Sequence, residues 1–421
     1  MLARGRWLVG GLMFLGGMIN YLDRSALSVA APFVAKDLHL DPARLGIVFS
    51  SFFWGYALFC FVGGWASDRF GPKRVYATAM LVWSLFCGLT AAAFSLVSLL
   101  VIRVCFGMGE GPIGSTANKM IRNWFPRESQ ASAISVANAG TPLGGAVSGP
   151  IVGFLALAAG WRVSFVAIAL IGIAWAIAWM LLVRDHPEQS AERAPAAPAT
   201  PAAPELPLAP LLLRPAVLAT GFAFFGYSCI LYFFLTWFPS YLLMAKHLSV
   251  KSMSLATVIP WMVGFVGLAS GGFLSDFLYR LTGNAVFARK LVLVSCLLAA
   301  AIGVACAGMV ASVPGAVALM AVSIFFMYLT GNTYFALVLD TVESPRVGGV
   351  SGFVHFIANC GGIVAPLVTG FIVQETGSFF SAFLLTGAIA VLGAAGVAAL
   401  VRAPAASAAA RIGAPRPAAS A

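Results

Sequence analysis

Charged residues are scarce in this sequence. Of its 421 residues only 9% are Asp, Glu, Lys or Arg, whereas 61% are hydrophobic. A soluble domain carries about 25% charged residues, so this composition excludes an ordinary soluble protein. The net charge of +11 comes from basic residues scattered between apolar runs, without a basic stripe or interleaved aromatic residues. The expected partner is therefore the lipid bilayer and not nucleic acid.

Metal-binding and disulfide patterns are also missing. The chain has seven cysteines and four histidines; every cysteine lies inside an apolar run, and none belongs to a Cys-x-x-Cys pair. Such cysteines are typical of buried, unreactive thiols, so we expect no metal site and no cofactor. The apolar runs contain neither a nucleophile with its base nor a phosphate-binding loop, which argues against an enzyme or a receptor with a catalytic domain.

Long apolar runs fill most of the chain. Cut at its polar clusters, the sequence gives twelve runs, each near the roughly 20 residues that a membrane-spanning helix needs. Only helices satisfy the backbone across lipid in segments this long, so the predicted fold is an all-α membrane protein with twelve transmembrane helices. The first run is too long for a signal peptide and carries Asp23 and Arg24, so we interpret it as a span. The runs cover approximately residues 8–32, 45–67, 75–94, 96–117, 129–157, 162–183, 215–243, 252–279, 290–310, 315–339, 347–373 and 379–401.

A polar segment rich in Pro and Ala divides the twelve runs six and six. Residues 184–213 cannot pack a core and are typical of an extended cytoplasmic linker. The pattern Gly-Gly-x-x-Ser-Asp closes the second run at residues 63–68 and the eighth at residues 271–276. Repeats six spans apart predict two similar bundles related by an axis along the membrane normal. The predicted domains are a six-helix bundle at 1–183, the linker, a second six-helix bundle at 214–402 and a disordered cytoplasmic tail at 403–421.

The distribution of basic residues predicts the orientation. If the N-terminus is cytoplasmic, eighteen of the 25 Lys and Arg residues fall in cytoplasmic segments and five on the other side. This bias places both termini in the cytoplasm. Asp68 lies near the N-terminal end of the following span. Its carboxylate can accept hydrogen bonds from the unpaired backbone N–H groups there. We interpret five charged residues at the cytoplasmic ends of spans as gating residues: Asp68, Arg69, Lys73, Arg74 and Asp276.

Four charged residues lie deep inside apolar runs: Asp23, Arg24, Arg103 and Glu110. Each costs about 2.5–3.5 kcal/mol to insert, so charges at this depth usually mark a functional site. Arg103 and Glu110 are seven residues apart and face the same side of a helix, and Asn20 shares a face with Arg24. The four formal charges sum to zero, as a low-dielectric cavity requires. The purely structural alternative is that they form ion pairs that hold spans together.

These residue types suit an organic anion and a coupling proton. The planar guanidinium of Arg24 can grip a substrate carboxylate with two hydrogen bonds. A poorly solvated carboxylate can exchange protons near neutral pH, which makes Asp23 and Glu110 the candidate proton carriers. Arg103 would modulate one of them, and Glu110 is its expected partner. Substrate binding to Arg24 would free Asp23 from that cation and favour its protonation.

Several motifs resemble those of a known family. Residues 64–74, Gly-Trp-Ala-Ser-Asp-Arg-Phe-Gly-Pro-Lys-Arg, are similar to the loop motif between the second and third spans of the major facilitator superfamily. Within that superfamily, five further stretches resemble the anion:cation symporter family, which includes bacterial importers of galactonate, glucarate and hexuronates. These stretches are residues 20–28, Arg103 with 109–112, 123–126, 235–239 and 359–366.

The resemblance implies a mechanism and a location. It implies a proton-coupled symporter that imports a sugar acid or related carboxylate across the bacterial inner membrane by alternating access. It also implies the roles given above: Arg24 binds the substrate carboxylate, Asp23 and Glu110 carry protons, and Arg103 modulates one of them. We expect a monomer. An efflux antiporter of the same fold is the alternative in another functional class, although Arg24 and Arg103 suit an anion better than a cationic drug.

Polar residues at other positions can bind substrate hydroxyl groups, and the candidates are Tyr21, Tyr56, Thr141, Asn332, His355 and Asn359. Sugar-acid members of the family commonly carry Gln, Asn and Trp where this chain has Thr141, His355 and Phe335. The resemblance therefore implies that the residues for the carboxylate and the proton are those of the family, whereas the residues that contact substrate hydroxyl groups differ. A sugar acid is the first expectation for the substrate, and a less hydroxylated or aromatic carboxylate is the alternative.

Overall fold

The computed structural model describes residues 2–187, 208–342 and 347–402, and within these ranges the regular structure is helical throughout. A 3-10 turn (Thr90–Ala92) follows α3. The helices are α1 (Leu2–Asp37), α2 (Pro42–Phe70), α3 (Pro72–Leu89), α4 (Leu96–Glu110), α5 (Ile113–Trp124), α6 (Arg127–Ala159), α7 (Trp161–Leu182), α8 (Leu208–Leu212), α9 (Pro215–Met244), α10 (Val250–Ala256), α11 (Val258–Thr282), α12 (Ala285–Met309), α13 (Val313–Leu329), α14 (Thr333–Thr341), α15 (Val347–Thr376) and α16 (Phe380–Leu400).

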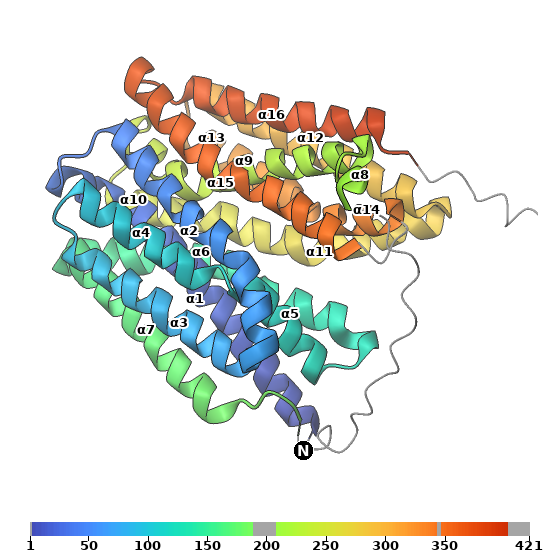
Figure 1. Cartoon of the computed structure of the whole chain (residues 1–421). Coiled ribbons are helices and arrows are strands. Elements are labelled where there is room, and N and C mark those ends of the chain that lie inside the picture. The colour runs from blue at the N-terminus through green and yellow to red at the C-terminus, as the bar shows by residue number, and fades with distance from the viewer. Residues whose placement is uncertain (1, 188–207, 343–346, 403–421) are drawn as a thin grey trace, which may run out of the picture.

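Within the described residues, eleven helical segments are long and apolar enough to cross a membrane. Three of them combine two helices each, namely α4 with α5, α10 with α11, and α13 with α14. The 36-residue helix α1 is not among the eleven, because Asn20, Asp23 and Arg24 in its middle lower its hydropathy. It nevertheless packs along α6 and α7 inside the helical body (Figure 1). The predicted all-α fold of twelve spans is confirmed, and the first span is the polar one.

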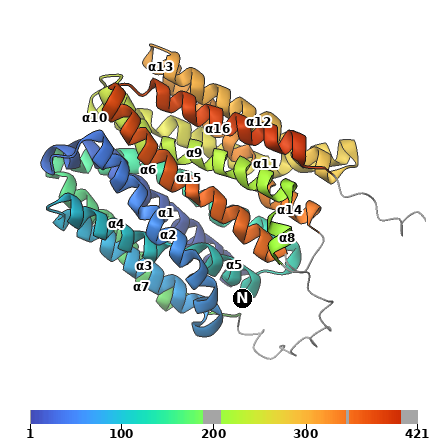
Figure 2. The same cartoon turned by 45° about the horizontal axis from the view of Figure 1, so that its top comes forward.

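The helices form two groups that lie side by side (Figures 1 and 2). In the first group α1 packs on α6, α2 on α4, and α3 on α7; in the second, α9 packs on α15 and α16, and α11 on α13. The groups precede and follow the predicted linker. The short helix α8 lies within that linker, whereas linker residues 188–207 and the predicted tail at 403–421 lie outside the described residues. The exact domain boundaries stay predictions.

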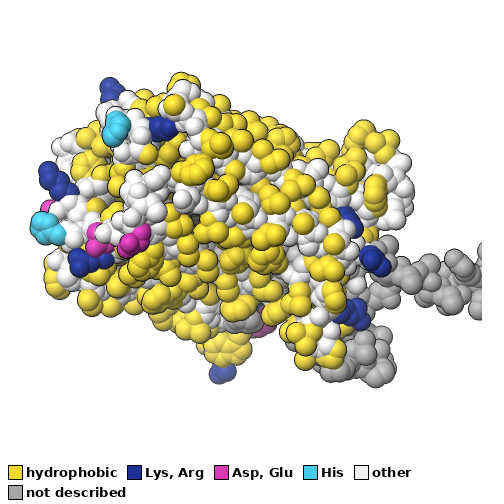
Figure 3. Space-filling view, turned by 90° about the horizontal axis from the view of Figure 1, so that it is seen from above, with side chains coloured by type: hydrophobic (Ala, Val, Ile, Leu, Met, Phe, Trp, Pro, Cys, Tyr) yellow, Lys and Arg dark blue, Asp and Glu magenta, His cyan; other side chains and the backbone are white. Residues whose placement is uncertain are grey.

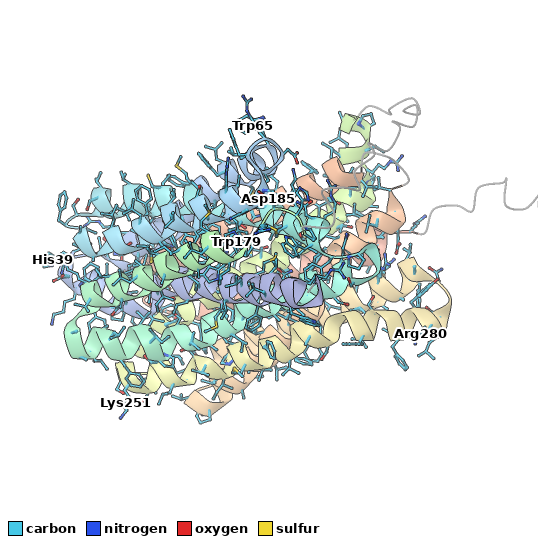
Figure 4. All side chains as sticks on the ribbon, turned by 90° about the horizontal axis from the view of Figure 1, so that it is seen from below. His39, Trp65, Trp179, Asp185, Lys251 and Arg280 are labelled. Atoms are coloured by element: carbon cyan, nitrogen blue, oxygen red, sulfur yellow. The ribbon has the colours of Figure 1, made fainter. Side chains whose placement is uncertain are left out.

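Charged side chains gather at the two ends of the helical body, and a broad apolar band separates them (Figure 3). Arg280 lies at one end, whereas His39 and Lys251 lie at the other (Figure 4). We call the end where α1 begins and α11 finishes the basic end, and the opposite end the far end. Large apolar side chains on the flanks are exposed, including Leu170 at 60% and Leu392 at 61%, as expected of a surface in contact with lipid.

Glycines let α4 lie close to α2 and α3. A Cβ atom on Gly107 would lie 2.0 Å from the carbonyl oxygen of Phe52, and one on Gly109 would lie 2.8 Å from the backbone nitrogen of Trp83. α4 ends at Glu110, since the proline two residues further on has no amide hydrogen to continue the helix. The glycine contacts and the break together place Glu110 in the middle of a span, between two neighbouring helices.

The two halves are in close contact at the far end. A Cβ atom on Gly46 of α2 would lie 2.8 Å from the carbonyl oxygen of Pro366 of α15. One on Gly149 of α6 would lie 2.4 Å from the carbonyl oxygen of Ser254 of α10. Any larger residue at these positions pushes the halves apart, because small residues are what allow helix backbones to approach this closely. The far end is therefore closed.

We predict that Gly46→Leu hinders closure of the far end, because the halves cannot reach the arrangement seen here. Cys60, which lines the cavity described below, reports the change: its alkylation from the basic end, read by mass spectrometry, should fall. Gly11→Leu is the matched control, since a Cβ atom there meets nothing within 4 Å. Unchanged Cys60 labelling in Gly46→Leu would show that this contact does not control closure.

Candidate functional site

A cavity of about 650 Å³ lies between the two halves. Its walls come mainly from α1, α2, α5 and α6 on one side, and from α14 and α15 on the other. The lining begins at Asn20 and Asn359 in the middle of the molecule and reaches the exposed residues Asn118 and Gly352 toward the basic end. Because the far end is closed, this conformation is open toward the basic end.

Four of the predicted substrate-binding residues line this cavity: Tyr56, Thr141, His355 and Asn359. Asn359 Nδ2 donates to the backbone carbonyl of His355 at 2.9 Å, and Thr141 Oγ1 donates to a carbonyl one turn back at 2.8 Å. The ring of His355 lies beside that of Phe335, with centroids 5.8 Å apart, and its Nδ1 is buried without a hydrogen-bond partner. The hydrogen-bonding capacity of this nitrogen is therefore unused in this conformation.

The other two polar candidates, Tyr21 and Asn332, are not part of the cavity wall. The Tyr21 ring packs edge-on against Trp261 of the other half, with centroids 5.8 Å apart, and lies 5.2 Å from the Arg24 guanidinium carbon. Asn332 is exposed in the break between α13 and α14. The structure corrects its expected place, because the tenth run is two helices and not one straight span. Tyr21 acts on Arg24 instead of facing the cavity.

Arg24 and Glu110 form a buried ion pair directly behind the cavity wall. Arg24 Nη2 donates to Glu110 Oε1, which joins α1 to α4, and the two side chains are 5% and 0% exposed. The Arg24 guanidinium carbon lies 4.9 Å from the ring centroids of both Tyr56 and Phe52. Arg24 Nε and Glu110 Oε2 have no hydrogen-bond partner. The pair therefore keeps one free donor and one free acceptor.

None of the four intramembrane charges lines the cavity itself. Asn20, whose Nδ2 has no hydrogen-bond partner, stands in the wall as a neighbour of Glu110, and the Tyr56 ring covers Arg24. The site of buried charges expected from the sequence is therefore not open to the cavity in this conformation, and Tyr56 and Asn20 lie between the cavity and the Arg24–Glu110 pair. Pairing explains the difference, because it neutralises both charges and lets them withdraw from solvent.

Asp23 and Arg103 are buried away from each other. Asp23 Oδ2 accepts a hydrogen bond from Trp83 Nε1 at 3.0 Å, whereas its Oδ1 has no partner. The guanidinium carbon of Arg103 lies 5.1 Å from the ring centroid of Phe106, and its Nε is likewise without a partner. In the part of the chain that the structure describes, neither residue belongs to an ion pair.

The expected charge pairs are therefore corrected. Arg24 holds Glu110 and not Asp23. Among the described residues Arg103 forms no ion pair with Glu110, but the two charges interact electrostatically, so a modulating role of Arg103 stays a prediction. Asp23 and Arg24 are consecutive on one helix, so their side chains point about 100° apart and meet different neighbours. Arg24 faces α4, while Asp23 faces α3.

The predicted gating residues occupy the basic end with partners that differ from those expected. Asp68 pairs with Lys119 of α5, and this ammonium group holds the pKa of the Asp68 carboxyl below its usual value. Asp185 caps the start of α3 instead. Its Oδ1 accepts a hydrogen bond from the backbone N–H of Lys73 at an N···O distance of 2.7 Å. Asp185 lies close to Trp179, whose indole donates to the Lys73 carbonyl at 3.1 Å (Figure 4). Asp68 does not cap the following span.

The remaining gating candidates are Arg69, Arg74 and Asp276. The Arg69 guanidinium carbon lies 5.8 Å from the ring centroid of Trp65, which stands out on the flank (Figure 4). Arg74 is exposed. The side chain of Asp276 lies outside the described part of the structure. The gating role of all five residues stays a prediction.

Some polar residues of the cavity wall were not singled out from the sequence. Asn138 precedes Thr141 by three residues on α6, so polar residues at helical spacing in an apolar run were the available signal. Asn118 and Ser351 line the part of the cavity nearer the basic end. Trp83 had no such signal, because its role appears only through its contact with another helix.

Comparisons with known proteins bear on this architecture. The sequence model of the Major Facilitator Superfamily matches residues 13–287. The chain is 53% identical over 393 residues to the hexuronate transporter of Bacillus subtilis (strain 168), and the match covers 93% of each protein. It is 33% identical over 398 residues to the probable sulfoacetate transporter SauU of Cupriavidus necator, and 31% identical over 412 residues to the probable galactarate/D-glucarate transporter GarP of Escherichia coli (strain K12), each match covering 92% of both proteins.

A solved structure has the same fold. A bacterial homolog of the human lysosomal transporter Spinster, in an inward-facing and occupied conformation, matches with a TM-score of 0.75. The match covers 93% of this chain and 96% of that one at 19% identity.

Two helical halves, a cavity between them and charges buried at mid-span define a membrane transporter and not an enzyme. The chain belongs to the major facilitator superfamily. Its similarity to transporters of hexuronate and of galactarate and glucarate confirms the resemblance to the sugar-acid members that the motifs indicated.

Proposed function

We propose that this protein is a proton-coupled symporter that imports a hexuronate-type sugar acid across the bacterial inner membrane. The observation that carries the proposal is the buried Arg24–Glu110 pair behind a cavity with polar walls. The pair combines a carboxylate-binding cation with a carboxylate that can carry a proton. The 53% identity to a hexuronate transporter supports the choice of substrate.

Charge balance explains how the two cargoes can be coupled. With all four intramembrane groups charged, the site is neutral, and Arg24 is occupied by Glu110. Protonation of Glu110 releases Arg24 and leaves a net charge of +1, which a monovalent carboxylate neutralises. Anion and proton together restore a neutral site, whereas either alone leaves an uncompensated charge in a low-dielectric region. Movement of the loaded halves is therefore favoured over movement with one cargo missing.

The layer of side chains in front of the pair has a role in this scheme. Tyr56 covers Arg24 from the cavity side, and Asn20 neighbours Glu110. For a substrate carboxylate to meet Arg24, the guanidinium turns from Glu110 toward the cavity past these two residues. The substrate's hydroxyl groups then meet Asn359 and the unpartnered Nδ1 of His355 on the opposite wall.

The orientation completes the proposal. The excess of Lys and Arg near one end assigns the basic end to the cytoplasm. The cavity then opens inward, and the structure represents the state that releases substrate into the cell. The opposite state opens the far end by separating the glycine contacts at Gly46 and Gly149.

A smaller or less hydroxylated acid is the second candidate substrate. The aromatic rings of Phe335 and Phe356 form part of the cavity wall, and the probable sulfoacetate transporter is a relative. Both observations favour an acid with fewer hydroxyl groups than a hexuronate.

Uptake by the purified protein in sealed proteoliposomes tests these proposals. An inward proton gradient should drive accumulation of a labelled hexuronate, and a protonophore should abolish that accumulation. The matching neutral hexose, which lacks the carboxylate, should not be taken up. Preference for an aromatic carboxylate or sulfoacetate over the hexuronate would select the second substrate. Export driven by the same gradient would contradict symport and favour an antiporter.

A further inference from the structure

Trp83 makes a contact that the coupling scheme above does not use. Its indole Nε1 donates to Asp23 Oδ2 at 3.0 Å, and both side chains are completely buried. The second carboxyl oxygen, Oδ1, is buried without a partner. The two oxygens of one carboxyl group therefore differ, because one is held by a neutral donor and the other is left open.

The backbone of Trp83 is also in close contact with a neighbouring helix. α4 packs onto it at Gly109, where a Cβ atom would lie 2.8 Å from the Trp83 nitrogen. Trp83 belongs to α3 and Asp23 to α1, and both helices lie in the first half of the molecule. Because both helices belong to one half, movement of that half as a rigid body against the other leaves this hydrogen bond intact.

The ionisable groups around Asp23 are few. Glu110 approaches from α4 and Cys87 from α3, and Arg24 is its neighbour on α1. Helices α6 and α7, which pack against α1, carry ionisable residues only near their ends, at Arg127, Glu128 and Arg162. α9, which also packs against α1, contributes the tyrosines Tyr227 and Tyr232 and the thiol Cys229.

Within the described residues, Trp83 is the only hydrogen-bond donor to Asp23, and no cation lies within ion-pair distance of its carboxyl group. A hydrogen bond to the charged form of a carboxylate lowers the cost of its ionisation. Trp83 is thus the one contact that favours loss of a proton from Asp23.

We propose that Trp83 is a positioning residue for proton coupling: it fixes the Asp23 carboxyl group through Oδ2 and reserves Oδ1 as the atom that passes the coupling proton to and from Glu110. The O–H bond at Oδ1 forms as that of Glu110 breaks, and it breaks as that of Glu110 forms, so no other reactant is needed. This inference rests on the proposed function as a proton-coupled symporter.

The test is the pH profile of proton-driven uptake in Trp83→Phe, which keeps the aromatic bulk and removes the N–H donor. Loss of a hydrogen bond to a charged group should make Asp23 hold its proton more tightly and move the pH of half-maximal uptake upward by about one unit. Trp175→Phe is the matched control. It removes another buried indole donor to α1, at 2.9 Å, but that donor bonds to the backbone carbonyl of Leu12. The control should keep the wild-type midpoint.

The outcomes separate this inference from the proposed function. A wild-type midpoint in Trp83→Phe overturns the role of Trp83 while proton-driven uptake by the wild-type protein stands. No proton-driven uptake by the wild-type protein overturns the symport proposal, and the inference with it. If Trp83→Phe does not fold, tryptophan emission of the wild-type protein carries the test. A pH-dependent change in emission should vanish in Asp23→Asn and persist in Glu110→Gln; emission that is identical in wild type and Asp23→Asn at every pH overturns the inference.

Discussion

Replacing Arg24 by alanine should weaken binding of the substrate anion by about 100-fold or more. A guanidinium that grips a carboxylate makes two charge-assisted hydrogen bonds, each worth roughly 1.5–3 kcal/mol, and alanine makes neither. Within the described residues the other buried cation of this region is Arg103, and the rings beside it, Phe52 and Phe106, do not line the cavity, whereas Tyr56 beside Arg24 does. Calorimetric titration of the purified protein with a hexuronate measures the loss.

Controls for Arg24→Ala must separate binding from folding. The substitution leaves Glu110 buried without its partner, and breaking such a pair costs about 3–5 kcal/mol. The double variant Arg24→Ala/Glu110→Gln removes the stranded charge, so it should recover thermal stability but not substrate binding. Arg162→Ala breaks an exposed ion pair with Asp37 at the far end and should leave affinity unchanged. Wild-type affinity in Arg24→Ala would assign the carboxylate to another residue.

Glu110→Gln should separate proton coupling from substrate movement. Glutamine resembles the protonated acid, so it releases Arg24 for substrate but cannot take up or release a proton. We expect proton-driven uptake to fall by on the order of tenfold or more, while counterflow exchange stays within about threefold of wild type. Both rates are measured in the same proteoliposomes, with and without an imposed gradient.

Glu375→Gln is the control for this experiment, because Glu375 is an exposed acid near the far end of α15. It should leave both rates unchanged. Equal loss of uptake and exchange in Glu110→Gln would instead make Glu110 a structural residue or a direct ligand of the substrate.

The sequence predicts much of the fold and the chemical character of the site. Two features depend only on local composition and can be recognised from the linear sequence: the apolar runs of spanning length and the repeat at 63–68 and 271–276. The depth of Asp23, Arg24, Arg103 and Glu110 follows from the same runs. Tyr56, Thr141, His355 and Asn359, which the sequence offers as substrate ligands, line the cavity, and their role as ligands stays a prediction.

The pairing of those charges could not be predicted in this way. Arg24 and Glu110 are 86 residues apart and meet only because glycines let α4 pack closely beside its neighbours. Trp83 and Asp185 act through partners on other helices, and nothing in their own neighbourhoods marks them. The position of Asn332 outside the cavity wall has a local cause. A short break between two helices changes the hydropathy of an apolar run very little, so the sequence gives one straight span where the structure has α13 and α14.

In the proposed cycle, one anion and one proton cross the membrane together through the Arg24–Glu110 pair. Its most direct test adds a hexuronate to proteoliposomes in weakly buffered medium and follows external pH with no imposed gradient. We predict that wild-type protein makes the medium more alkaline as labelled substrate enters, and that Glu110→Gln does not. Substrate entry by the wild-type protein without any movement of protons would contradict the account.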